Sequence, residues 1–264
     1  MLAPEDNPHF KKMLKLFEGY RYKFDMYTVF EDFLYMCSAS ISNATDFVHY
    51  NEREAEYMRR VKKYSRDEAN GMAEIMAELV MALELQPYDY LGALFMKLEI
   101  NNKWKGQFFT PYNISYMMAK ITLPLTKEAL MLEIEQKGGR ITVNDGAVGG
   151  GAMIIAMYHA MLDLDVNPQE YLCAVSQDID KRSVLMTFIQ TALLGIDNTV
   201  ILGDTLKLEC KEVWRTPGRF LRLIRHLMFS KKIDVVEEVT SEMLDEVENI
   251  DVIVQESGQM ALSI

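Results

Sequence analysis

The segment from residue 140 to residue 204 alternates short β-branched or apolar runs with longer helical ones. Strands are expected at 140–144, 171–176 and 199–202, and helices at 152–164 and 182–194 between them. A strand, helix, strand, helix, strand succession predicts a doubly wound parallel sheet with helices packed on it. We therefore expect an α/β fold, in which ligands bind at the carboxyl ends of the strands.

An aspartate follows each of the three expected strands: Asp145, Asp178 and Asp204. In a parallel sheet, these carboxylates emerge at the same edge. The loop after the first strand, D-G-A-V-G-G-G-A, is rich in glycine, which lets the backbone approach a ligand closely. One such acid is commonly a strand or helix cap. Three at matching positions, the first joined to a glycine loop, indicate a nucleotide-like ligand.

The glycine loop fits neither common phosphate-binding motif. Val148 stands where G-x-G-x-x-G needs its second glycine, and no G-x-x-x-x-G-K-[ST] sequence occurs. Because acidic residues repel a pyrophosphate, a nucleoside ligand without phosphate is favoured.

Three regions follow from the changes of pattern along the chain. Residues 1–103 are expected to be helical, since apolar residues recur at three- and four-residue spacing, as at Met72, Ile75, Met76 and Leu79. Residues 104–232 hold the expected sheet. Residues 233–264 form an acidic and, we expect, flexible tail.

Four motifs in series resemble the adenine-specific (N6) DNA methyltransferases related to type I restriction-modification methylase subunits, and in particular their short phage- and prophage-encoded members. They are GQFFTP (106–111), similar to that family's G-x-F-x-T-P, then VNDGAVGGGAMIIA (143–156), AVSQDID (174–180) and ILGDTL (201–206). The resemblance covers roughly residues 88–206. It implies a Rossmann-like sheet that binds S-adenosylmethionine (AdoMet).

The resemblance also implies roles for single residues. Phe108, Thr110 and Pro111 would line the AdoMet site from the N-terminal side. Asp145, Gly149 and Gly151 would surround the methionine moiety. Asp178 would accept hydrogen bonds from the ribose hydroxyls, and Asp204 would lie near the adenine amino group. Carboxylates suit these donors, because an ionised carboxylate only accepts hydrogen bonds. For Phe109, core packing and a site role are equally favoured.

The catalytic signature of the family, [NDS]-P-P-[YFW], is missing. Residues 207–217 read KLECKEVWRTP, and Trp214 in this stretch is expected to be packed rather than free to stack on a base. The partial match at Asn7-Pro8-His9-Phe10 follows no strand and is discounted. The apolar run 251–254 resembles the strand that leads to the signature, but it continues as QESGQ. No catalytic residue is therefore assigned.

The charge of the chain is unevenly distributed. The net charge is −11, but nine acidic and no basic residues lie between Ile233 and the C-terminus, so the first 232 residues carry a net of −2. Seven basic residues lie between 211 and 232, and RFLRLIRHLMF (219–229) has the spacing of a basic amphipathic helix. We take Arg215, Arg219, Arg222 and Arg225 as candidate contacts to DNA, although a solvated helix face is the commoner outcome for such a pattern. The terminal QMALSI (259–264) is similar to the peptide that docks on bacterial sliding clamps.

Other features exclude whole classes of protein. Three widely spaced cysteines form no CxxC pair, which argues against a disulfide framework or a metal site. No apolar run approaches the ~20 residues that cross a bilayer, and no signal peptide is recognisable. We expect a protein of the bacterial host's cytoplasm. The leading hypothesis is an AdoMet-dependent DNA adenine-N6 methyltransferase with a degenerate or missing catalytic motif. The alternative is a catalytically inactive AdoMet- or DNA-binding accessory or anti-defence protein on the same fold. A small-molecule methyltransferase is disfavoured by GQFFTP.

Overall fold

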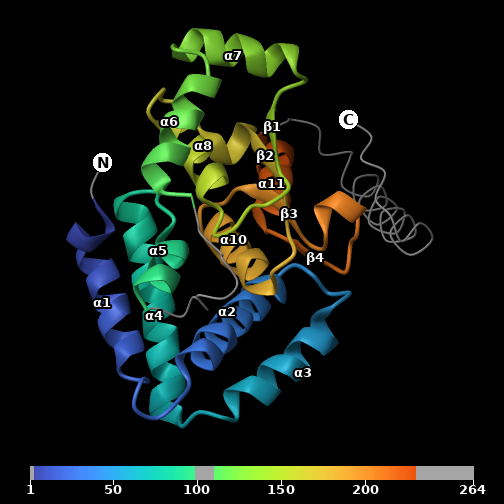
Figure 1. Cartoon of the computed structure of the whole chain (residues 1–264). Helices are drawn as coiled ribbons and strands as arrows, with labels where there is room; N and C mark the ends of the chain where they lie inside the picture. Colours follow the sequence, from blue (N-terminus) through green and yellow to red (C-terminus); the bar gives the residue numbers. More distant parts are fainter. Residues whose placement is uncertain (1–2, 99–109, 230–264) are drawn as a thin grey trace.

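A computed structural model describes residues 3–98 and 110–229 (Figure 1). The first part is helical: η1 (Pro4–Asp6), α1 (Pro8–Glu18), α2 (Met26–Ser42), α3 (Tyr50–Val61), α4 (Arg66–Leu85) and α5 (Tyr90–Lys97). The second part holds α6 (Tyr112–Thr122), α7 (Lys127–Gln136), β1 (Ile141–Asp145), α8 (Ala152–Leu162), α9 (Pro168–Tyr171), β2 (Leu172–Asp178), α10 (Lys181–Leu193), β3 (Asp197–Leu202), η2 (Thr205–Lys207), β4 (Glu212–Arg215) and α11 (Gly218–Phe229).

The strands form one sheet in the order β1-β2-β3-β4. The first three are parallel, as the strand and helix pattern predicts, and β4 runs antiparallel to β3. The α/β fold is thus confirmed. The carboxyl ends align as expected, with Asp145 opposite Ser176 and Asp178 opposite Leu202. Asp145 and Asp178 are the last residues of their strands, whereas Asp204 lies two residues beyond β3.

The two crossover helices fix where the loops of the sheet lead. Helix α8 packs against β1, α10 packs against β2 and β3, and α6 lies beside α8. Helix α10 is almost entirely buried, and Asp180 caps its first turn by accepting from the Arg182 backbone N–H at 2.9 Å. The ends of β1 and β2 therefore open directly onto two helix N-termini.

Strand β4 carries the aromatic residue that the sequence places after β3. Trp214 is buried, with its ring 5.4 Å from that of Phe188 and 6.0 Å from that of Tyr35, and the Arg53 guanidinium lies 4.1 Å from its centre. The prediction that Trp214 is packed is confirmed. The strand itself is not predicted, since four residues are too few to show a period.

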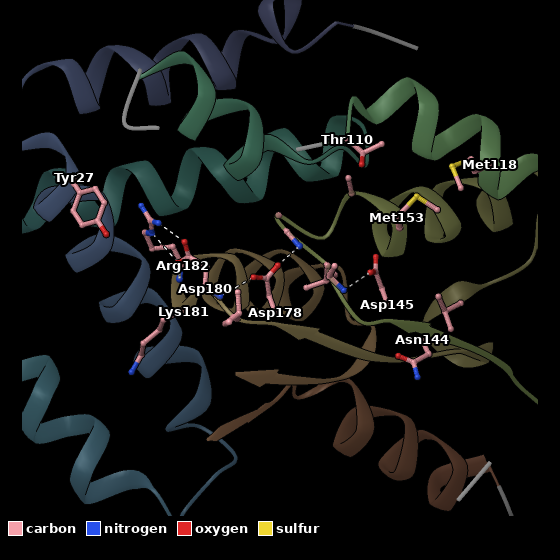
Figure 2. A pocket seen from close by; sticks show the side chains of 17 residues that line it. Tyr27, Thr110, Met118, Asn144, Asp145, Met153, Asp178, Asp180, Lys181 and Arg182 are labelled. Atoms are coloured by element: carbon pink, nitrogen blue, oxygen red, sulfur yellow. Dashed lines mark hydrogen bonds and ion pairs between the residues drawn. The ribbon is translucent and has the colours of Figure 1, made fainter. Parts of the chain in front are cut away.

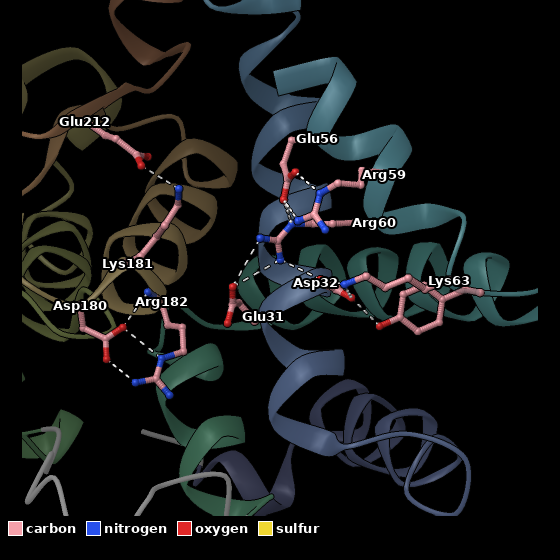
Figure 3. Close-up of polar contacts among 11 residues, drawn as sticks. Glu31, Asp32, Glu56, Arg59, Arg60, Lys63, Asp180, Lys181, Arg182 and Glu212 are labelled. Carbon is pink, nitrogen blue, oxygen red and sulfur yellow. Dashed lines mark hydrogen bonds and ion pairs between the residues drawn. The ribbon is translucent and has the colours of Figure 1, made fainter. Parts of the chain in front are cut away.

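The N-terminal helices pack directly on the sheet region. Helix α2 lies along α10, and Arg53 of α3 donates to the carbonyl of Val213 in β4 at 3.0 Å. Figure 3 shows charged residues on the two sides of this contact: in the helical part, the buried Asp32 of α2 with Arg60 and Lys63, and in the sheet region, Lys181 of α10 with Glu212 of β4 at 2.8 Å. The expected boundary at 103/104, the tail at 233–264 and the QMALSI peptide all lie outside the described residues.

Candidate functional site

A cavity of about 970 Å³ opens at the carboxyl ends of β1 and β2 (Figure 2). The end of β1, the glycine loop and the start of α8 form one wall. The turn from β2 into α10 forms the other. Thr110, Met118 of α6 and Tyr27 of α2 complete the lining. This is the edge at which the sequence predicts a ligand, and the volume is of the size that small-molecule sites commonly have.

The glycine loop adopts conformations that other residues rarely take. Gly149 has a φ of 58° and Gly151 has a φ of 95°, in the left-handed region. The Asp145 carboxylate accepts from the Ala147 N–H at 3.1 Å, and the Thr187 hydroxyl of α10 donates to the carbonyl of Gly149 at 3.0 Å. The loop is therefore held at both ends while its backbone faces the cavity.

Asp178 lies at the centre of the site. Its carboxylate accepts from the N–H of Gly149 at 2.9 Å and from the N–H of Asp180 at 2.8 Å. An ionised carboxylate has about four acceptor positions, so about two stay available to a ligand. Burial raises the pKa of Asp178 above its ordinary value, and the neighbouring carboxylates of Asp180 and Asp145 act in the same direction. The site thus favours a ligand that brings hydrogen-bond donors and positive charge.

The two basic residues of the lining already have acidic partners. The Arg182 guanidinium pairs with Asp180, with Nε 3.0 Å from Oδ1, and Lys181 pairs with Glu212. The lining holds three carboxylates, those of Asp145, Asp178 and Asp180, against these two cations, which favours a ligand without phosphate over one with it.

The ends of the cavity are apolar or aromatic. Tyr27 stands at one end, where the Arg182 guanidinium lies 4.6 Å from its ring centre, and Met118 and Met153 stand at the other (Figure 2). Ile179, which is 68% exposed, lies on the rim between Asp178 and Asp180. Flat or apolar parts of a ligand would find contacts here, away from the acidic centre.

The structure brings together some of the predicted cofactor residues. Thr110, Asp145, Gly149 and Asp178 line the cavity, and Gly151 caps α8 next to it. Pro111 precedes α6 on the surface. Asp204 does not line this cavity. It caps η2 through the Leu206 N–H, and its hydrogen bond from Lys207 lowers its pKa. Phe108 lies outside the described residues, as does the neighbouring Phe109.

The predicted DNA-contacting arginines lie on β4 and α11. Arg215 ends β4, and Arg219 and Arg222 lie in the first turns of α11. Arg222 pairs with Asp197 of β3 at 2.6 Å, so this arginine is engaged within the protein. Arg225 lies in α11, but its side chain is outside the described part. Their contact with DNA stays a prediction.

Sequence reasoning missed several residues of the site. Tyr27 lies more than a hundred residues before the glycine loop, and nothing in its local sequence marks it. Asp180 and Arg182 carried a recognisable signal, because D-x-D-x-R at a strand-to-helix turn is a helix cap with a charged partner. The discounted Asn7-Pro8-His9-Phe10 is indeed a helix cap, since the buried Asn7 side chain accepts from the His9 N–H at 2.9 Å.

The family model for N-6 DNA methylase matches residues 87–240, which is more than half of the chain. The chain belongs to the N-6 DNA methylase family. This confirms the resemblance drawn from the four motifs, and the matched range contains the glycine loop, Asp178 and α11. Among curated proteins, none matches the chain.

Two solved structures are similar in fold to this methylase-family chain. One is a Listeria monocytogenes protein described as a class I S-adenosylmethionine-dependent methyltransferase, with 15% identity and a TM-score of 0.39, over 77% of this chain and 55% of that one. The other is the type I restriction-modification methyltransferase subunit from Streptococcus thermophilus, with 17% identity and a TM-score of 0.36, over 75% and 39%. The chain thus corresponds to about half or less of each.

Within residues 3–98 and 110–229, no group of three or more His, Cys, Asp or Glu side chains is arranged to hold a metal ion. No helix in that same part of the chain is long and apolar enough to cross a membrane.

Proposed function

We propose that the chain binds AdoMet in the cavity at the ends of β1 and β2, and that it is an AdoMet-dependent methyltransferase acting on the N6 of adenine in DNA. One observation carries the cofactor part of this proposal. Asp178 is partly buried, is oriented by two backbone N–H groups, and keeps acceptor positions at a cavity lined by two further carboxylates. A vicinal diol and a cationic group are what such a site binds best.

The chemistry of AdoMet fits the residues present. Asp178 would accept from the ribose hydroxyls, and the acidic surround with Asp145 would balance the sulfonium and ammonium charges. Backbone groups of the glycine loop would contact the methionine moiety. The bound cofactor supplies the methyl group. We keep Phe108, Thr110, Pro111, Gly151 and Asp204 as proposed contacts on the strength of the family motifs.

DNA is the proposed partner. The family membership and the basic amphipathic character of α11 support this, with Phe220 and Leu221 exposed between Arg219 and Arg222. Cations on one helix gain affinity for a phosphate backbone by releasing its counterions. A sliding clamp as a second partner rests on the QMALSI peptide alone. The proposed compartment is the cytoplasm of a bacterial host cell, and a phage origin is part of the same hypothesis.

A second candidate function follows from the missing signature. No two prolines are adjacent anywhere in the sequence, so [NDS]-P-P-[YFW] does not occur. The aromatic residue nearest the expected position, Trp214, is buried under Arg53 and Tyr35. A non-catalytic AdoMet- or DNA-binding accessory or anti-defence protein would keep the cofactor site without this clamp.

Methyl transfer separates the two candidates. The full chain is incubated with AdoMet labelled in its methyl group and with adenine-containing DNA, beside the Asp145→Ala variant. Label in N6-methyladenine that disappears in the variant supports the enzyme. AdoMet binding by calorimetry without transfer to any DNA refutes the enzyme and supports the accessory protein. Absence of AdoMet binding refutes the proposal as a whole.

A further inference from the structure

The glycine loop is hydrogen-bonded, behind the cavity, to a buried side-chain amide, that of Gln190. Gln190 of α10 is fully buried, and its side-chain Nε2 donates to the carbonyl of Gly150 at 2.8 Å and to Oδ1 of Asp89 at 2.9 Å. Its Oε1 accepts from the N–H of Leu91 at 3.1 Å. One side chain thus ties the loop at the cavity to the start of α5, in the N-terminal helical region.

Asp89 is the second member of this contact. It is 5% exposed and caps α5 by accepting from the Gly92 N–H at 2.8 Å. The carboxylate lies between two glycines, Gly92 of α5 and Gly150 of the loop. A Cβ atom on Gly150 would lie 2.5 Å from Asp89 Oδ2, and one on Gly92 would collide with the same oxygen.

Gly150 is therefore restricted to glycine for a different reason from Gly149 and Gly151. Gly149 and Gly151 need glycine for their positive φ, but Gly150 lies outside the left-handed region. Its constraint is the close approach of the Asp89 carboxylate. This close approach buries the Asp89 carboxylate. Burial removes its hydration, which raises its pKa and costs free energy of folding. A costly group placed against a ligand loop indicates a role in setting the position of that loop.

We propose that Asp89 and Gln190 are positioning residues for the cofactor loop, and that through them the start of α5 sets the affinity for AdoMet. Gln190 holds the Gly150 carbonyl, and Asp89 limits how far the loop moves away from the cavity. Neither residue lines the cavity, so both act through the loop. The proposal rests on the proposed AdoMet site.

A double-mutant cycle tests the contact between α5 and the loop. AdoMet affinity is measured by calorimetry for the wild type, Gly150→Ala, Asp89→Ala and the double variant. We expect Gly150→Ala to weaken binding by about tenfold or more, because the new methyl group displaces the loop from Asp89. In the Asp89→Ala background the same change should cost less than about threefold, since the carboxylate is gone. Equal costs in both backgrounds would overturn the proposal.

A matched variant separates positioning from mere stability. Thr191, next to Gln190, is equally buried, and its hydroxyl donates to the Thr187 carbonyl at 2.7 Å without touching the loop. Gln190→Ala and Thr191→Val should both lower the melting temperature, but only Gln190→Ala should weaken AdoMet binding and speed amide exchange at 146–151. Equal effects of the two variants on both readouts refute the inference. If the wild type binds no AdoMet, the proposed function fails, and the exchange rates still decide whether Gln190 holds the loop.

Discussion

Replacing Asp178 by asparagine removes one charge from the cavity and almost no volume. The native carboxylate accepts from two backbone N–H groups, those of Gly149 and Asp180. The asparagine oxygen can accept from one of them, which leaves the other donor facing an NH₂ group. An unsatisfied buried donor costs about 1–3 kcal/mol. The variant also no longer buries a charge, so the two effects oppose each other. We expect the free energy of unfolding to change by less than about 2 kcal/mol.

Asp178→Asn should weaken AdoMet binding more than it changes the free energy of unfolding, because no second effect compensates for the lost hydrogen bonds to the ligand. Hydrogen bonds to a charged group contribute about 1.5–3 kcal/mol, and tenfold in affinity corresponds to about 1.4 kcal/mol. Asp178→Asn should therefore weaken AdoMet binding by roughly 10- to 150-fold in isothermal titration calorimetry. The control is Asp197→Asn. Asp197 is the first residue of β3, at the other end of the sheet, and its carboxylate pairs with Arg222. A loss of threefold or less in Asp178→Asn, or an equal loss in the control, would show that the Asp178 carboxylate does not hold AdoMet.

Three further predictions concern the ionisation of Asp178, the packing of Trp214 and the contact of α11 with DNA. Burial raises the pKa of Asp178, so ionisation of this carboxyl lowers the folding stability as pH rises through its pKa. AdoMet affinity should instead fall as pH is lowered through the same pKa, because the protonated carboxyl no longer carries a charge. Calorimetry across the acidic range should show this fall in the wild type, and the same fall in Asp178→Asn would count against Asp178 as its cause. Trp214→Ala should lower the free energy of unfolding by about 3–5 kcal/mol in denaturant titrations, because the buried ring fills the space between Phe188 and Tyr35; a loss under 1 kcal/mol would contradict this packing. Replacing Arg219 and Arg225 by alanine should weaken DNA binding at all sequences and reduce the slope of log K against log salt by about 2; an unchanged slope would exclude α11 as a DNA contact.

The sheet and its ligand edge were predictable because their signals are local. Each of the first three strands shows a β-branched or apolar run, and a helical run lies between each strand and the next, so the order of elements favours a parallel sheet. Once the strands are parallel, Asp145 and Asp178 must emerge on one edge. The glycine loop was recognisable for the same reason, since Gly149 and Gly151 adopt positive φ angles and this need for glycine shows in a short stretch of sequence.

Contacts between distant segments were not predictable in this way. Tyr27 reaches the cavity because α2 packs along α10, and this packing depends on side chains spread over both helices. The network of Asp89, Gln190 and Gly150 joins residues up to 101 positions apart. A polar Gln190 within an apolar helical run was a visible signal of a buried hydrogen bond, but its partners were not. Asp204 lies at the shared edge that its place in the series suggested, since the N–H of Gly203 donates to the carbonyl of Asp178 at 3.0 Å and the Thr205 hydroxyl donates to the carbonyl of Gly146. The series did not show that the Asp204 carboxylate caps η2 and does not line the cavity.

The proposed function depends first on AdoMet binding at the carboxyl ends of β1 and β2. The most direct test is a crystal structure of the full chain grown with AdoMet above its dissociation constant. We expect ligand density in the cavity, with the ribose hydroxyls within hydrogen-bond distance of Asp178 and the methionine moiety against the glycine loop. Density for AdoMet at another place, or an empty cavity under conditions in which calorimetry shows binding, would contradict it.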